Sequence, residues 1–237
     1  MLEGKIVIIT GASRGLGRAL TFAFAKEGAN LVITSRSARS LDPVAEEAEG
    51  SGVEVLAIPA DVSRSAHIER LVGAAIERFG RIDVLINNAS LLGPRVPIEG
   101  YPEDEWRNVL EANLTGPFLL TKAGIPHMPE GGSIVNVTSG VSIEGRAGWG
   151  AYSVSKFGVE GLTQILAAEL EERGIRANSV DPGGMRTEMR AAAYPDEDPM
   201  TRITPEENTD VFLYLASDES KGVTGERFKA QEFKQAH

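Results

Sequence analysis

Short runs of apolar residues alternate with longer stretches of helical periodicity along almost the entire chain. The apolar runs are continuous, which is typical of strands in a parallel sheet that helices cover on both faces. The pattern predicts six buried strands and one short last strand, at residues 5–10, 30–35, 53–59, 83–87, 133–137, 176–180 and 226–230.

Helical stretches separate these strands. In the first of them, Leu16, Leu20 and Phe24 recur every four residues and therefore share one face. Similar patterns predict helices at residues 41–49, 65–79, 103–122 and 151–173. Another helix is expected from 204 to 216, because the segment TPEE at 204–207 combines a capping Thr, a Pro at the first helical position and a Glu three residues after the cap.

The repeated order of strand and helix predicts a doubly wound α/β sheet. No linker, low-complexity segment or internal repeat divides residues 1–237, so a single domain is expected. Residues 184–203 are rich in Pro, Asp, Glu and Arg and predict a loop, with one helical turn at 187–193.

Composition narrows the function classes. The chain has 237 residues, of which 42% are apolar, a net charge of −10 and no cysteine. Thiolate chemistry and disulfides are therefore excluded, and the negative charge argues against binding nucleic acid or an anionic membrane. The three histidines are scattered, so no metal site is expected. No apolar run reaches the roughly 18 residues of a membrane span, and no secretory signal is evident, so a soluble cytoplasmic protein is expected.

A glycine-rich turn joins the first strand to the first helix. The segment TGASRGLG, residues 10–17, has the spacing G-x-x-x-G-x-G. Glycines at such a turn let the backbone bend tightly and approach a pyrophosphate, which then faces the free N–H groups of the helix N-terminus. An ordinary strand-to-helix turn is the alternative, but the position at the start of a βα series favours a nucleotide site.

Tyr152 and Lys156 form the candidate acid/base pair. They lie four residues apart in a predicted helix, so their side chains share one face. A cation ~4 Å from a phenol, at an effective dielectric constant of about 20, would lower the phenol pKa from about 10 toward neutrality. The same spacing occurs on many solvated helix faces, and the pair alone does not exclude that reading.

Seven motifs in register give the chain a resemblance to the short-chain dehydrogenase/reductase (SDR) family over nearly its whole length. They are residues 10–17, Asp61-Val62, Asn87-Asn88-Ala89, Asn113, Ser139, Tyr152-x-x-x-Lys156 and Pro182-Gly183-x-x-x-Thr187. Ser139 precedes Tyr152 by 13 residues, the usual interval in that family. The resemblance implies a three-layer, doubly wound Rossmann-type α/β fold with a mostly parallel seven-stranded sheet. It makes residues 1–237 one dinucleotide-binding domain with a substrate loop at about 184–203.

The resemblance also implies a reaction, namely hydride transfer between a nicotinamide cofactor and a carbonyl or secondary alcohol. Tyr152 is then the general acid or base, and Ser139 hydrogen-bonds and orients the substrate oxygen. Lys156 lowers the phenol pKa and holds the nicotinamide ribose. Asn113, followed by Gly116-Pro117, implies a helix kink that frees a carbonyl for a water in a proton relay. A tolerated polar residue on a bent helix is the alternative.

The candidate cofactor-binding residues follow several of the predicted strands or lie in the helix at 151–173. They are Gly11, Ser13, Arg14, Gly15, Leu16, Gly17, Ser35, Arg36, Asp61, Val62, Asn88, Ala89, Tyr152, Lys156, Pro182, Gly183 and Thr187. Asp61 is expected to accept from the adenine amino group, with a simple turn residue before a helix capped by Ser63 as the alternative. Thr187 is expected to meet the carboxamide, with a plain Pro-Gly turn as the alternative at 182–183.

The second strand favours NADP(H) over NAD(H). An NAD site usually has an acidic residue at the end of this strand to hold the ribose 2′-hydroxyl. Here Ser35 stands at that position, Arg36 follows, and Arg14 lies in the glycine turn. Two guanidinium groups could clamp the 2′-phosphate. Ordinary surface arginines are the alternative, although a cation in a first helical turn is mildly unfavourable and so suggests a ligand.

Two departures from the family pattern bear on geometry and assembly. Ser90 stands where the family usually has Gly, which is strained only if its φ is positive. The last strand reads ERFKAQ at 226–231, followed by a polar tail, where many relatives end in Asp-Gly-Gly and form a tetramer contact. A homodimer through the helices at 103–122 and 151–173 is expected. The altered last strand supports a homotetramer less well.

The substrate is expected to be a small carbonyl or alcohol. Apolar walls are predicted from Leu91, Leu92, Val141, Trp149 and Met185. Arg95, Arg146, Arg186 and Arg190 could attract an acidic substrate, although solvated loop arginines are the commoner reading. An NADP(H)-dependent carbonyl reductase or alcohol dehydrogenase is the leading hypothesis. A non-catalytic NADP(H)-binding sensor or scaffold, and a lyase or epimerase, are the alternatives.

Overall fold

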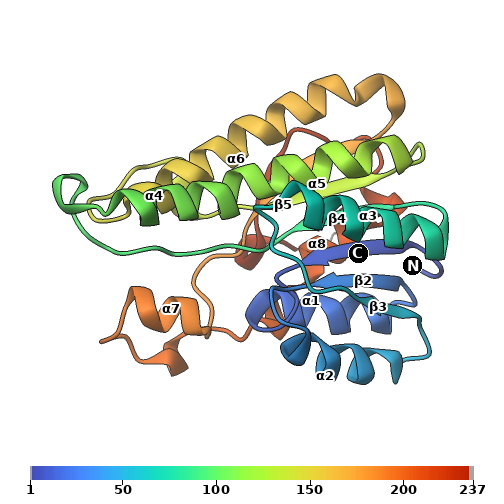
Figure 1. Cartoon of the computed structure of the whole chain (residues 1–237), viewed down its shortest axis with the longest axis horizontal. Coiled ribbons are helices and arrows are strands. Elements are labelled where there is room, and N and C mark those ends of the chain that lie inside the picture. Colours follow the sequence, from blue (N-terminus) through green and yellow to red (C-terminus); the bar gives the residue numbers. More distant parts are fainter. Residues whose placement is uncertain (1, 235–237) are drawn as a thin grey trace.

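The computed structural model describes residues 2–234 and contains one seven-stranded sheet (Figure 1). Its strands are β1 (Ile6–Thr10), β2 (Asn30–Thr34), β3 (Val55–Ala57), β4 (Val84–Asn87), β5 (Ser133–Val137), β6 (Arg176–Asp181) and β7 (Arg227–Lys229). Their order is β3-β2-β1-β4-β5-β6-β7, and every neighbouring pair is parallel. The doubly wound α/β fold predicted from the sequence is confirmed, and the sheet is parallel throughout rather than mostly so.

Helices cover both faces of the sheet and make three layers (Figure 1). One face carries α1 (Gly15–Lys26), α2 (Ala38–Glu49) and α8 (Asp210–Ala216), and the other carries α3 (Ser65–Phe79), α4 (Glu103–Leu110), α5 (Gly116–Gly124) and α6 (Gly150–Glu169). Successive side chains of a strand point to opposite faces. Accordingly Val7 and Ile9 of β1 pack into the core with α1, whereas Ile8 packs into the opposite core with α3 and α5.

The predicted helix at 103–122 is interrupted. It begins as α4, widens into a π turn at Glu111–Thr115 and continues as α5. The break expected near Gly116-Pro117 takes the form of this π turn. Pro117 follows it at the start of α5 and has no N–H with which to continue the helical hydrogen bonding. The buried side chain of Asn113, described below, holds the wide turn in place.

Two further helix predictions need correction. The helix predicted at 151–173 ends at Glu169, and a short 3₁₀ turn, Glu171–Arg173, leads to Gly174 at φ 65°. The helix predicted from 204 does not start there. Glu207 does accept from the Thr204 N–H at 2.8 Å, as the capping signal predicts, but only a 3₁₀ turn (Glu206–Asn208) forms before α8. The buried Asn208 side chain instead donates to the Pro182 carbonyl at 2.8 Å.

The functional edge of the sheet follows from its winding. From β1 the chain proceeds outward through β2 and β3, and then returns to the other side of β1 with β4. In open parallel sheets such a reversal leaves a crevice outside the carboxyl ends of the strands, where ligands bind. Residues 184–203, called the flap below, lie beyond β6 at this edge and contain the short helix α7 (Glu188–Ala193), which projects beneath the long helices in Figure 1. The helical turn predicted at 187–193 is thereby confirmed.

Within residues 2–234, every helix is too short or too polar to cross a membrane. Residues 235–237, the end of the predicted polar tail, lie outside the described part of the chain.

Candidate active site

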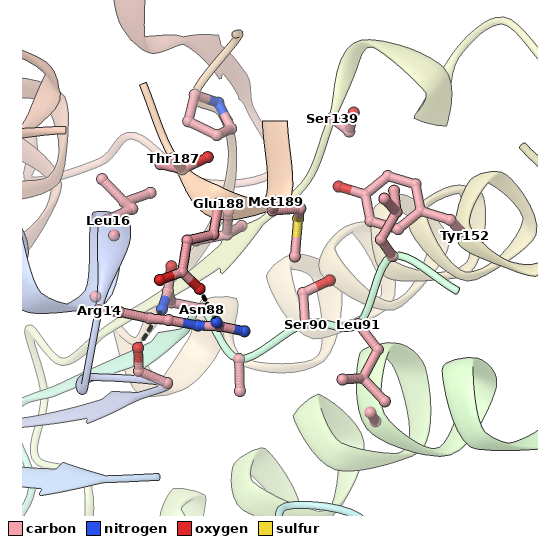
Figure 2. A pocket seen from close by; sticks show the side chains of 18 of the residues that line it. Arg14, Leu16, Asn88, Ser90, Leu91, Ser139, Tyr152, Thr187, Glu188 and Met189 are labelled. Carbon is pink, nitrogen blue, oxygen red and sulfur yellow. Dashed lines mark hydrogen bonds and ion pairs between the residues drawn. The ribbon is translucent and has the colours of Figure 1, made fainter. Parts of the chain in front are cut away.

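A cavity of about 1360 Å³ opens at the carboxyl edge of the sheet. The residues predicted to bind the cofactor all line it: Gly11, Ser13, Arg14, Gly15, Leu16, Gly17, Ser35, Arg36, Asp61, Val62, Asn88, Ala89, Tyr152, Lys156, Pro182, Gly183 and Thr187. Ser139 lines it as well. Asn113 alone among the predicted site residues does not, because its side chain is fully buried. The cavity extends from the glycine turn to Tyr152 on α6 (Figure 2).

The glycine turn is shaped for close contact. A Cβ on Gly17 would lie 2.2 Å from the Gly11 carbonyl oxygen, and one on Gly11 would lie 2.9 Å from the Ala89 Cα. Gly11 and Gly15 have φ values of 68° and 53°, which side chains disfavour. Only glycine therefore fits this turn, as the phosphate-cradle reading requires.

The N-terminus of α1 is open to an anion. Arg14 occupies the capping position without a side-chain hydrogen bond to the helix, and the first turn contains no acidic residue. The backbone N–H groups at this end therefore have no capping carboxylate or hydroxyl as acceptor. Together with the glycines, they form a cradle that fits the pyrophosphate of a dinucleotide.

Neighbouring strand ends hold the cradle rigidly. The Thr10 hydroxyl accepts from the N–H groups of Asn88 and Ala89, each at 3.0 Å. The Asn88 amide in turn donates to the Thr10 carbonyl at 2.7 Å. The Asn88 side chain thus links the end of β4 to the end of β1. The Asn88 backbone and Ala89 lie along the cavity wall. Ser90 follows with a non-positive φ, since every positive φ among the described residues belongs to glycine. Its departure from the family pattern therefore causes no backbone strain, although the Ser90 hydroxyl is buried without a hydrogen-bond partner.

The end of the cavity near β2 contains the residues predicted to select the cofactor. Ser35 and Arg36, the two residues that follow β2, line this end, and neither is acidic. Asp61 accepts from the Ser63 N–H at 3.1 Å and from the Ser63 hydroxyl at 2.7 Å. Burial alone would raise the pKa of Asp61, but these hydrogen bonds and Arg64 outweigh it and lower the pKa. Ser63 does not cap the following helix, whose capping residue is Arg64.

Arg14 has a partner that the sequence did not reveal. Its guanidinium forms an ion pair with Glu188 at the start of α7, across 174 positions of the chain (Figure 2). The flap is thereby tied to the glycine turn over the mouth of the cavity. No local signal could predict this pair, because it depends on how the flap folds back.

Tyr152 and Lys156 lie side by side inside the cavity on the first turns of α6. Figure 2 shows the Tyr152 ring pointing into the cavity, on the same side as Ser139. The Lys156 ammonium donates to the Val137 carbonyl at 2.8 Å and lies 5.7 Å from the centroid of the Tyr152 ring. Both side chains are buried, at 8% and 2% exposure.

Burial dominates the protonation of this pair. It raises the pKa of Tyr152 to about 12, with the nearby Ser139 hydroxyl lowering it and the Asp181 charge raising it further. It also lowers the pKa of Lys156 to about 8, against the raising effect of Glu160. The sequence-based expectation that Lys156 brings the phenol toward neutrality is therefore wrong for the free protein. The ammonium points to a backbone carbonyl, and loss of hydration outweighs its attraction for a phenolate.

Asn113 acts from behind the cavity wall. Its side-chain oxygen accepts from the Leu91 N–H at 2.7 Å, and its amide donates to the Leu91 carbonyl at 2.8 Å and to the Ser155 hydroxyl at 3.1 Å. The π turn thus brings one buried amide against both backbone groups of Leu91. Because Leu91 lines the cavity, Asn113 fixes part of its wall.

The turn after β6 is also preorganised. Gly183 has a φ of 67°, and its N–H donates to the Asp181 carboxylate at 2.9 Å. The Thr187 hydroxyl caps α7 by accepting from the Arg190 N–H at 3.2 Å. This capping role was not predicted, and it fixes the Thr187 side chain at the cavity edge.

The wall near Tyr152 is apolar and aromatic, as predicted. The predicted residues Leu91, Leu92, Val141, Trp149 and Met185 line it, and Met189 and Tyr194 of the flap join them. Trp149 stacks at 5.6 Å from Tyr152 and 6.0 Å from Tyr194, measured between ring centroids.

Three of the four arginines predicted near the substrate have structural partners. Arg95 lies over the rings of Trp149 and Tyr194, at 4.4 and 5.0 Å from their centroids. Arg190 binds Glu197 through two hydrogen bonds of 2.6 Å, and Arg186 donates to two backbone carbonyls of the flap. Arg146 is exposed and lines the cavity. Arg95, Arg186 and Arg190 are thus held by contacts within the flap and its neighbours.

Among residues 2–234, no three acidic or histidine side chains gather as metal ligands would. The polar groups of the cavity instead suit an organic ligand with phosphates at one end and a neutral reacting group at the other.

Comparison with known proteins agrees with this reading. Residues 5–198 match the family model for the short chain dehydrogenase. The chain is 40% identical to the 3-oxoacyl-[acyl-carrier-protein] reductase FabG of Thermotoga maritima, covering 95% of both chains. It is 36% identical to the uncharacterized oxidoreductase YciK of Escherichia coli K12, covering 98% of this chain and 93% of the relative. A solved short chain dehydrogenase structure from Shigella flexneri 2a, complexed with NADP, superposes with a TM-score of 0.93 at 36% identity, covering 97% and 98% of the two chains.

The parallel sheet and the glycine turn at its switch point, together with the family match, make this chain a Rossmann-type oxidoreductase. The chain belongs to the short-chain dehydrogenase/reductase family.

Proposed function

We propose that this protein is an NADP(H)-dependent oxidoreductase that transfers a hydride between nicotinamide and a carbonyl or secondary alcohol. The observation that supports this proposal most is that Tyr152 and Ser139 line the same cavity as the glycine turn, with Lys156 one turn further along α6. The bound cofactor would supply or accept the hydride.

The residues then divide the remaining work. Reduction of a carbonyl places negative charge on its oxygen, and Tyr152 donates the proton that neutralises it. A phenol with a raised pKa stays protonated at neutral pH and is ready to donate. Ser139 hydrogen-bonds the same oxygen and holds it against Tyr152. Lys156 and Asn113 complete the catalytic set, Lys156 by holding the nicotinamide ribose and Asn113 by fixing Leu91 behind the site.

The cofactor would lie along the cavity with its pyrophosphate on the glycine turn. Ser35 and Arg36 support a preference for NADP(H), since neither would repel a 2′-phosphate and Arg36 would bind it. Arg14 is a second candidate, and it would exchange Glu188 for the phosphate. The Shigella relative crystallised with NADP is consistent with this choice.

The substrate end favours an apolar carbonyl compound. Aromatic rings and aliphatic side chains surround Tyr152. Arg190 and Arg186 of the flap are occupied by Glu197 and by backbone carbonyls, and Arg95 lies over the Trp149 ring. We assign substrate selection to the flap, within a single domain that spans the chain. A neutral cyclic or branched ketone would fill this wall better than a highly polar sugar.

Assembly is proposed to be a homodimer through α5 and α6. Their outward faces expose large apolar side chains, among them Phe118, Val154, Phe157 and Ile165, at 44–55% exposure. Large exposed apolar side chains that cluster on one face mark a protein interface. Both helices lie on the outer surface of one layer in Figure 1, so a second copy can reach them.

The deciding experiment follows NADPH oxidation against a panel of carbonyl compounds, with the Tyr152→Phe variant in parallel. We expect turnover by the native chain and at least a 100-fold loss in the variant, in the range typical for removal of a general acid. NADPH binding, followed by fluorescence, should survive the substitution. Full activity of Tyr152→Phe would refute the mechanism, and tight NADPH binding without turnover of any carbonyl would favour a non-catalytic sensor.

A further inference from the structure

Arg227, in the unusual last strand, connects to the active site from behind. It opens β7 and pairs in register with Ser179 of β6. Its guanidinium lies between two carboxylates, with Nε 3.1 Å from Glu160 Oε1 and Nη2 2.9 Å from Asp181 Oδ2. Nη2 also donates to the Ser139 carbonyl at 3.3 Å. Arg227 does not line the catalytic cavity.

The two carboxylates extend these contacts to the catalytic segments. Glu160 accepts from the Ser142 hydroxyl at 2.8 Å and, through its other oxygen, from the Ser179 hydroxyl at 2.7 Å. Asp181 accepts from the Gly183 N–H at 2.9 Å. The Arg227 guanidinium thus links α6, the loop after β5 and the turn after β6.

The carboxylates also face the acid/base pair. Tyr152, Lys156 and Glu160 follow one another at four-residue intervals along α6, so they lie on the same face. Asp181 lines the cavity at the end of β6. The exposed fractions of Arg227, Glu160 and Asp181 are only 20%, 14% and 11%, so water screens their charges little.

We propose that Arg227 is a positioning residue of the active site, which holds the Ser139 loop and the 181–183 turn in place and offsets the charges of Glu160 and Asp181 beside Lys156 and Tyr152. Two carboxylates against one arginine leave a net charge of −1 behind the pair. Without Arg227 that charge would be −2, and Lys156 would retain its proton to a higher pH.

Other ionisable groups belong to the same cavity. Those that line the cavity are Arg14, Arg36, Asp61, Glu105, Glu111, Arg146, Arg186, Glu188, Arg190 and Tyr194. The pKa values of Tyr152 and Lys156 respond specifically to Asp181 and Glu160 respectively. The effect of Arg227 is therefore expected to reach the pair through these two carboxylates.

The test is a titration of Lys156 in the free protein by ¹³C-lysine NMR, with its resonance identified by its loss in Lys156→Met. We expect Arg227→Met to raise the pKa of Lys156 by about one unit from its starting value of about 8. Arg227→Lys, which keeps the charge, should restore the original value. The triple variant Glu160→Gln, Asp181→Asn, Arg227→Met removes all three charges and should bring the pKa back to the starting value or below.

Arg176→Met is the matched control. Arg176 is another buried arginine of the same sheet, but it donates to the carbonyls of Leu215 and Ser217. Its loss should destabilise the fold and leave the Lys156 titration unchanged. A folded Arg227→Met protein with an unmoved Lys156 pKa would overturn the proposal.

A second variant decides the matter if Arg227→Met does not fold. Glu160→Gln keeps Arg227 and removes the carboxylate nearest Lys156 along α6, so the Lys156 pKa must fall, and an unchanged value refutes the proposal. The inference rests on the proposed roles of Tyr152 and Lys156, but the titration needs no substrate. Failure to find a reducible carbonyl would therefore not be mistaken for failure of the Arg227 network.

Discussion

At the scale of single residues, the acid/base pair illustrates how burial changes chemistry. Spacing alone placed Tyr152 and Lys156 on one helix face, and the structure brings them together in the cavity. The direction of the phenol pKa did not follow from spacing, because it depends on solvent exclusion and on where the ammonium points. Burial raises the phenol pKa most, Asp181 adds to it, and the Val137 carbonyl accepts the ammonium; none of these has a signature in the local sequence.

The buried lysine should make the free protein less stable than it could be. The pKa of Lys156 is about 8 in the folded chain against an ordinary 10.5. Below pH 8 both states bind the proton, and the folded state carries the full cost of the buried charge. Between pH 8 and 10.5 the unfolded state binds more protons, so stability rises with pH across that window. Tyr152, whose pKa is raised from 10.0 to about 12, acts oppositely and lowers stability as pH rises from 10 to 12.

Lys156→Met should therefore raise the free energy of unfolding at pH 7, by about 1–3 kcal/mol, while severely reducing turnover. Urea unfolding of the free protein at pH 7 measures the change. Lys122→Met, at an exposed position of α5, is the control and should alter neither quantity. A loss of stability in Lys156→Met would contradict the assignment of a buried, costly ammonium.

Cofactor preference is also decided by single residues. Arg36→Asp places a carboxylate where the 2′-phosphate is expected and should weaken NADPH binding about tenfold or more, with NADH little affected. Fluorescence titration with both cofactors measures the ratio of dissociation constants. Arg39→Asp offers a comparable charge change on α2 outside the cavity. An unchanged NADPH:NADH ratio in Arg36→Asp would refute the phosphate contact.

At the scale of elements, periodicity predicted the strands well and helix interruptions poorly. Five of the six strands predicted to be buried, β1, β2, β4, β5 and β6, lie at their apolar runs and are buried. The sixth, predicted at 53–59, is shorter and only half-buried, because β3 (Val55–Ala57) is an edge strand. The π turn and the break before α8 arise from buried amides, Asn113 and Asn208, whose partners Leu91 and Pro182 are distant in sequence. Helix propensities describe local preferences of single residues, so they cannot predict contacts between distant parts of the chain.

The flap is better ordered than its composition suggests. Glu197 accepts from Arg190 and Arg202 at once, and hydrogen bonds from both arginines lower its pKa to about 2. The Glu197 carboxylate therefore stays charged until the pH falls well below 4. Together with the Arg14–Glu188 pair, this cluster keeps α7 against the cavity.

Glu188→Gln should free Arg14 for the cofactor phosphates. The pair is exposed, so its loss should change stability by less than about 1 kcal/mol. NADPH affinity should rise several-fold, because Arg14 no longer has to exchange one anion for another. Isothermal titration calorimetry measures this effect, and Glu47→Gln, which removes the Arg18 ion pair outside the cavity, serves as control. A weaker affinity would mean that Glu188 itself helps to bind the cofactor.

At the scale of the whole molecule, the parallel sheet gathers chemistry at one edge and leaves the helices free for assembly. The doubly wound sheet followed from the βα repeat, and the structure supplies the strand order and the switch point. The contribution of β7 did not follow from that repeat, because the importance of Arg227 appears only when Glu160 and Asp181 are seen on either side of it. The last strand thus supports the site, whatever it contributes to a larger assembly.

Phe157→Glu should convert the proposed dimer to a monomer. The side chain is 44% exposed on α6, and a buried, unpaired carboxylate would oppose association. Sedimentation velocity of the native and variant chains decides the point. Met200→Glu, at a 69% exposed apolar residue of the flap, is the control and should leave the oligomeric state unchanged. A native chain that is already monomeric would refute the dimer.

The π turn between α4 and α5 makes the number of residues in this stretch critical for the fold. An α-helix rotates about 100° per residue, so adding or removing one residue turns everything beyond it by that angle. The turn at Glu111–Thr115 absorbs one such residue. Loss of a single codon here would permit an unbroken α-helix and swing Asn113 away from Leu91, or the Phe118 face away from solvent. Descendants of this gene should therefore tolerate substitutions within the turn more readily than insertions or deletions.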